Sequence, residues 1–152
     1  MEKKQLDSYY DFACETFDLF ETSYNSGLVN NNMGALAQEA CEKFLKHIID
    51  VYIVSADDEI NWEKIGLLRV HSLKLLLRFI NEKLDDFPIN NYELNDIDGF
   101  YYTTRYPSEE SIILDEQDIK HVRKIVRKCK RKVDEYIEKK ENEKKKEREL
   151  FM

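Results

Sequence analysis

Apolar residues recur three or four positions apart along most of this chain, with polar and charged residues between them. That spacing places the apolar side chains on one face of a helix, so it predicts amphipathic helices rather than strands. The chain has only four glycines and two prolines, which leaves few turns for a fold with many strands. We therefore expect an all-α fold, an antiparallel up-and-down bundle of about five helices.

The apolar stripes and the polar breaks between them place the predicted helices. Asn30, Asn31 and Asn32 offer caps before the second stripe, and Phe87 and Pro88 end the third because proline disfavours helix in the residue before it. The third stripe is broad, which predicts a helix in the middle of the bundle. Residues 62–68 are expected to form a short helical turn or a loop. The expected helices cover residues 6–24, 30–52, 71–87, 94–101 and 115–148.

The last predicted helix is long and basic. It begins near Asp115, with Asp118 in the first turn where negative charge suits the helix dipole. Carried to Arg148 it would be roughly 50 Å long, longer than a compact bundle of this size. We therefore predict a bundle domain over residues 1–138 and a charged extension, helical or frayed, over residues 139–152.

The charge is distributed unevenly. Residues 120–152 contain 14 Lys/Arg and 7 Asp/Glu, a local net charge of +7, whereas residues 1–119 contain 10 and 24, a local −14. The body should repel nucleic acid, while the last helix could attract a phosphate chain or an acidic partner. A solvated helix face explains most basic runs. The alternative is a phosphate- or RNA-facing stripe of Lys120, Lys124, Arg127 and Arg131.

The remaining chemistry-bearing residues form no recognised catalytic or metal-binding pattern. The histidines His47, His71 and His121 share no HxxxH spacing, and no Walker or GxSxG motif is present, so we expect no metal and no cofactor. Asp96 and Asp98 lack the other ligands of a calcium loop. The odd count of three cysteines without CxxC predicts free thiols in a reducing cytoplasm. No apolar run is long enough for a membrane span, and the first residues lack the apolar core of a signal peptide, so we expect a cytoplasmic protein with no membrane partner.

One stretch, FYYTTRYPSEES at residues 100–111, gathers four aromatic rings around Arg105. An arginine can grip a phosphate while tyrosines stack on a base or close a pocket. The alternative is a structural corner in which the rings pack inward and the arginine ties a loop to a helix end. From residue types alone the structural corner is the commoner case.

Three segments together resemble the HEPN domain family. AQEACEKFLK at residues 37–46 resembles the family's AxEAxEKxLK signature, and HSLKLL at residues 71–76 looks like its histidine-and-leucine opening to a helix. YTTRYP at residues 102–107 is similar to its tyrosine–arginine–tyrosine–proline segment. The resemblance covers roughly residues 8–137. It implies an antiparallel helical bundle, usually dimeric, related to the substrate-binding domains of nucleotidyltransferases.

The resemblance implies two kinds of function. Some members are thought to bind nucleotides beside a separate minimal nucleotidyltransferase, and others are ribonucleases, often in toxin–antitoxin pairs, that use an arginine and a histidine with four to six residues between them. Positions 40–42, 64–66 and 114–116, where that arginine would precede each histidine, hold none. We therefore predict a non-catalytic, homodimeric nucleotide-binding or adaptor protein acting with a minimal nucleotidyltransferase.

The carried-over nucleotide site consists of residues from the three matching segments: Arg105, Tyr102, Tyr106, His71, Lys43 and Lys46. Two alternatives stay open. One is a toxin-like ribonuclease or RNA-binding protein that uses Arg105 and the basic last helix. The other is a purely structural dimerisation module.

Overall fold

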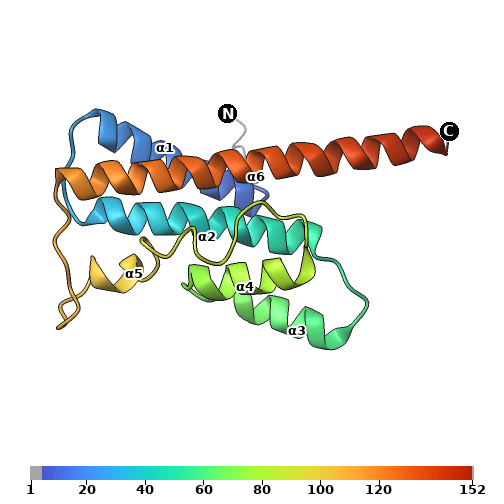
Figure 1. The fold of residues 1–152 in the computed structure, drawn as a ribbon, viewed down its shortest axis with the longest axis horizontal. Helices are drawn as coiled ribbons and strands as arrows, with labels where there is room; N and C mark the ends of the chain where they lie inside the picture. Colours follow the sequence, from blue (N-terminus) through green and yellow to red (C-terminus); the bar gives the residue numbers. More distant parts are fainter. Residues whose placement is uncertain (1–4, 152) are drawn as a thin grey trace.

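The computed structural model describes residues 5–151, and these residues form six helices and no strand (Figure 1). The prediction of an all-helical bundle with a long last helix is confirmed. The additional helix is α3, where a short turn or a loop was expected. The helices are α1 (Tyr9–Asn25), α2 (Asn32–Tyr52), α3 (Asp58–Leu67), α4 (Leu73–Lys83), α5 (Phe100–Thr103) and α6 (Glu116–Leu150).

Polar side chains fix where most of these helices begin. Ser8, Asp57 and Ser72 each accept a hydrogen bond from a backbone N–H in the first turn of the helix that follows. Asp115 and Asp118 form a reciprocal capping box at the start of α6, so the predicted start of that helix is confirmed.

The central helix of the bundle is α2. Thirteen of its 21 residues are buried, and it contacts each of the other five helices. Figure 1 shows α1 and α6 on one side of α2, with α4 and α3 on the other. The expectation that the helix after His71 occupies the middle was therefore wrong: α4 packs its apolar face on α2 and leaves Leu75 and Arg78 exposed.

The long helix α6 buries only its first two thirds. Its buried stripe runs from Ile119 to Tyr136, and residues 141–150 are all exposed. Figure 1 shows this last part of α6 extending beyond the other helices. None of the helices in residues 5–151 combines the length and the apolar content needed to cross a membrane.

The three thiols are free, and two of them lie in the core. Cys41 and Cys129 are buried, whereas Cys14 is half-buried. The pKa of the Cys41 thiol is raised by its hydrogen bond with Cys129 and by burial. The Cys41 thiol therefore stays protonated, and both buried cysteines pack as small apolar side chains.

Candidate functional site

The short helix α5 holds the aromatic residues of the FYYTTRYP segment against α2. Gly99 precedes it with φ 90°, a left-handed conformation that favours glycine. On α2, a Cβ at Gly34 would lie 3.1 Å from Phe100 and from Thr104, so the close approach of the two helices depends on this glycine. We call Tyr101, Tyr102, Tyr106 and Arg105 the tyrosine–arginine cluster.

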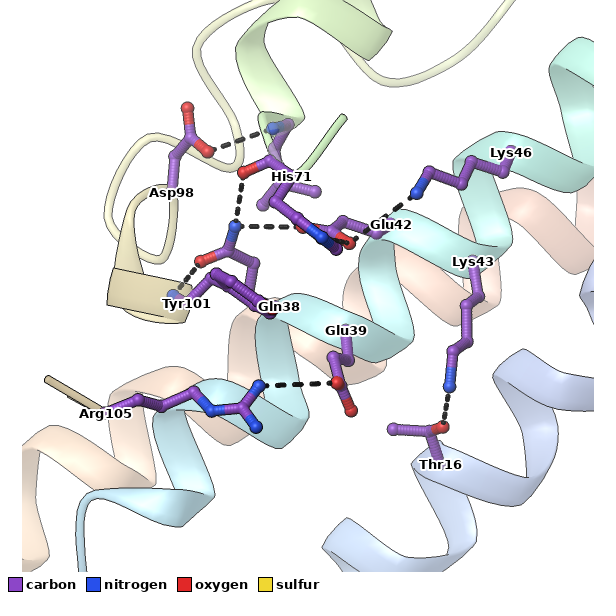
Figure 2. A network of polar contacts seen from close by, with 11 residues as sticks. Thr16, Gln38, Glu39, Glu42, Lys43, Lys46, His71, Asp98, Tyr101 and Arg105 are labelled. Carbon is purple, nitrogen blue, oxygen red and sulfur yellow. Dashed lines mark hydrogen bonds and ion pairs between the residues drawn. The ribbon is translucent and has the colours of Figure 1, made fainter. Parts of the chain in front are cut away.

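Tyr101 lies at the centre of the cluster, between His71 and Arg105 (Figure 2). The His71 and Tyr101 rings are stacked, with centroids 4.0 Å apart and planes 5° apart. The Arg105 guanidinium carbon lies 4.8 Å from the Tyr101 centroid, a cation–π contact. The structure thus brings together His71 and Arg105, which the sequence places on separate segments, with one tyrosine ring between them.

A buried polar network on α2 positions this stack, and Gln38 is its junction. The Gln38 side chain is fully buried. Its Nε2 donates to Glu42 Oε1 at 3.0 Å and to the His71 carbonyl at 2.9 Å, and its Oε1 accepts from the Tyr101 N–H at 2.6 Å (Figure 2). One amide therefore links α2 to the start of α4 and to α5.

Glu42 connects the network to the basic side chains of His71 and Lys46. Its Oε2 lies 3.1 Å from His71 Nδ1 and 3.9 Å from Lys46 Nζ. Burial raises the pKa of the Glu42 carboxyl, although His71 and Lys46 act in the opposite direction. Burial likewise lowers the pKa of the Lys46 ammonium against the pull of Glu42. Lys46 therefore acts as a buried partner of Glu42 rather than as a surface charge.

The outer side of the cluster is open to solvent. Tyr102 and Tyr106 are 58% and 51% exposed, and the Arg105 side chain is 36% exposed. Arg105 Nη1 lies 3.7 Å from Glu39 Oε1, beyond hydrogen-bond length. The guanidinium therefore keeps donors available to an anion beside two exposed tyrosine rings.

Lys43 does not join the predicted site. Its Nζ donates to Thr16 Oγ1 on α1 at 2.8 Å, so the side chain turns toward α1 (Figure 2). Asp98 lies beside the site: its carboxylate accepts from the Leu73 N–H at 2.9 Å and helps to cap α4 next to His71. That contact also gives Asp98 a structural role.

Gln38, Glu39, Glu42 and Tyr101 were not predicted as site residues. Gln38 and Glu42 are four positions apart among the apolar residues of α2, and these two polar residues within an apolar stripe were the available signal.

Carboxylates from other helices and loops neutralise much of the basic run on α6. Glu21 pairs with Arg123 at 2.8 Å and with Arg127 at 3.8 Å, and Glu93 pairs with Lys128 and Lys132. Lys120 and Arg131 each approach a glutamate on α6 itself, at 4.0 and 3.9 Å. Within residues 5–151, Lys124 is the base of this run that has no carboxylate within 4.0 Å. The predicted phosphate-facing stripe is therefore only partly free.

The comparisons with known proteins identify the family of the chain. No curated protein and no solved structure matches it. A family model, described as the HEPN domain, matches residues 62–140, which is just over half of the 152 residues. The match includes α4, α5 and most of α6, and with them His71, Tyr101 and Arg105. The chain belongs to the HEPN domain family.

Proposed function

We propose that this protein is a non-catalytic, nucleotide-binding HEPN protein whose ligand binds at the tyrosine–arginine cluster. The observation that carries the proposal is the exposed combination of Arg105 with Tyr102 and Tyr106. Arginine recognises phosphate through charge-assisted hydrogen bonds, and tyrosine rings stack on bases of any sequence. The two properties meet on one surface.

The contacts of Tyr101 leave different roles for the three tyrosine rings of the cluster. Both faces of Tyr101 are occupied, one by His71 and the other by Arg105. A base would therefore stack on Tyr102 or Tyr106, and Tyr101 would hold Arg105 in place. Since Glu39 lies 3.7 Å from Arg105 without a hydrogen bond, a phosphate can compete for the guanidinium at little cost.

Catalysis is not part of this proposal because the arginine–histidine spacing of the ribonuclease members is absent at all three histidines. The family resemblance supports a homodimer acting with a minimal nucleotidyltransferase. Sedimentation of the purified chain tests the dimer, and a monomer at micromolar concentration would contradict it. Co-purification tests the nucleotidyltransferase, and its absence from the purified complex would leave a nucleotide-binding protein without that partner.

The nucleotide site is tested by a thermal-shift screen against ATP, GTP and the other ribonucleotides. Saturation at a hundred times the dissociation constant adds about 2.7 kcal/mol, or roughly 5–11 °C for a chain of this size. Arg105→Ala and Tyr102→Ala should each abolish the shift. Arg78→Ala and Tyr92→Ala are matched controls, because both residues are exposed on other segments. The proposal fails if no nucleotide shifts the wild type, or if the controls lose the shift equally.

One observation favours a second candidate, a ribonuclease that uses His71. Glu42 holds His71 Nδ1 at 3.1 Å, an arrangement that orients the ring and leaves Nε2 for a substrate proton. This candidate predicts RNA cleavage that is lost in both His71→Ala and Arg105→Ala. Absence of cleavage by the wild type, or cleavage indifferent to either substitution, would remove it.

A further inference from the structure

A second concave surface lies at the start of α6, between that helix and the end of α1. It has a volume of about 340 Å³, and we call it the α6 hollow. Four of its lining residues are cationic and none is a carboxylate. The lining residues are Tyr24, Gln117, Lys120, His121, Arg123, Lys124 and Arg127.

The cations of the α6 hollow differ in how firmly they are held. Arg123 is fixed, because its guanidinium stacks 4.2 Å from the Tyr24 centroid and binds Glu21 at 2.8 Å. Lys120 and Arg127 approach carboxylates only at 4.0 and 3.8 Å, and both are at least half exposed. Lys124 is exposed and has no such partner in the described chain. Loose, exposed pairs of this kind are worth little, so an anion can replace the carboxylates.

A smaller hollow of about 250 Å³ adjoins it and shares His121 and Lys124. Its lining is different: Ile89, Leu94 and Ile125 contribute apolar surface, and Glu93 and Asp96 contribute carboxylates, of which Asp96 lies 2.8 Å from His121 Nε2. Its other lysines, Lys128 and Lys132, are both held by Glu93. Attraction for an anion is therefore concentrated in the α6 hollow, and the neighbouring hollow offers apolar contact.

We propose that the α6 hollow binds the phosphate backbone of single-stranded nucleic acid, with a neighbouring base resting on the apolar hollow. This site is separate from the nucleotide site proposed above. Lys120 to Arg127 extend over about 10 Å of helix axis, which suits consecutive phosphates of a chain better than one phosphate group. The apolar side chains of the neighbouring hollow suit bases, which a bare phosphate chain lacks, whereas the Tyr24 ring already carries the Arg123 guanidinium. The acidic body confines the strand to this face.

The test is fluorescence anisotropy with labelled oligouridylate and oligoadenylate of roughly 12 nucleotides, a length within the site sizes of single-strand binders. If about three phosphates are neutralised, binding should weaken roughly 20-fold between 50 and 200 mM salt. Lys124→Glu/Arg127→Glu should weaken it at least about tenfold and flatten the salt dependence. The matched control is Lys145→Glu/Lys146→Glu, which makes the same charge change on exposed residues of the same helix.

Three results would overturn the proposal. The first is no binding at low salt, and the second is an equal loss in the control, which would indicate attraction by net charge alone. The third is equal competition by inorganic polyphosphate, polyglutamate or a mononucleotide, each of which would assign the hollow to another ligand. Lys124→Gln/Arg127→Gln should give a smaller loss in the same direction, and circular dichroism melting verifies that every variant is folded. Lys124→Glu/Arg127→Glu should keep the thermal shift that nucleotides produce, which separates this proposal from the nucleotide site.

Discussion

The junction at Gln38 gives a quantitative test of how the candidate site is built. Gln38→Met keeps the length of the side chain and removes all three of its hydrogen bonds. The Tyr101 N–H then loses its acceptor, the His71 carbonyl loses a donor, and Glu42 loses one of the groups that stabilise its charge. A buried polar group left without a partner costs about 1–3 kcal/mol. Because the His71 carbonyl has a second lone pair and His71 is partly exposed, we expect a total loss of about 2–4 kcal/mol.

The assay is urea denaturation followed by circular dichroism, supported by thermal melting. A loss of about 2–4 kcal/mol corresponds to a melting temperature lower by roughly 4–16 °C. Gln117→Met is the matched control, since Gln117 is exposed, and it should change stability by less than about 0.5 kcal/mol. If Gln38→Met lost no more stability than Gln117→Met, water would be replacing the hydrogen bonds of the amide. The hydrogen bonds of Gln38 could then not be what positions Tyr101 and His71.

Three further predictions concern packing and titration. Gly34→Ala should destabilise the fold by about 1–3 kcal/mol, because the new Cβ would lie 2.7 Å from Leu114 Cδ1. Gly66→Ala should instead stabilise α3 by about 0.5–1 kcal/mol, because a Cβ there would have no atom within 4 Å. Thermal melts of the two variants measure both changes. Tyr136 donates to Asp86 at 3.0 Å, and burial followed by this bond raises its pKa to about 12 from 10.0. The folded protein therefore holds the phenol proton more tightly than the unfolded chain does. The unfolding free energy of the wild type should exceed that of Tyr136→Phe fully below pH 10, and this difference should disappear toward pH 12 in urea titrations. A difference that stayed constant with pH would contradict this. Trp62 is 73% exposed, so Trp62→Phe should leave the unfolding free energy within about 0.5 kcal/mol, and the native fluorescence should already be red-shifted.

Much of the fold was predictable because the strongest signals are local. The stripes of α1, α2 and α6 and the Asp115 capping box depend on residues within one or two turns. α3 was not predictable in this way, because none of its ten residues is buried and no apolar stripe exists. Ile60 and Leu67 pack only partly against the core, and local contacts add to this: Asp57 caps the start of α3, and Lys64 donates to the Ile53 carbonyl at 2.6 Å.

The candidate site was predictable only as a set of segments. The motifs named Arg105 and His71, but their contacts with Tyr101 depend on how α4 and α5 each pack on α2, which no local pattern states. Lys43 and Lys46 lie three positions apart in one motif, yet the chain gives them different partners, Thr16 on α1 and Glu42 on α2. The pairing of the basic run with Glu21 and Glu93 likewise requires contacts across the bundle.

The position of the Tyr101 ring bears on the two functions considered for the tyrosine–arginine cluster, nucleotide binding and RNA cleavage. RNA cleavage by the second candidate needs His71, as general base, within about 2.6–3.2 Å of the reacting hydroxyl, and Arg105 on the same phosphate. His71 and Arg105 contact opposite sides of one ring, with Tyr101 filling the space where such a phosphate would lie (Figure 2). Cleavage by this pair would therefore require Tyr101 to leave, although its N–H is bound to the buried amide of Gln38 at 2.6 Å. Binding at Arg105 from the outer side requires no such movement. The proposed ligand-binding site therefore needs no rearrangement of Tyr101, and RNA cleavage by the wild type that depended on both His71 and Arg105 would refute this reasoning.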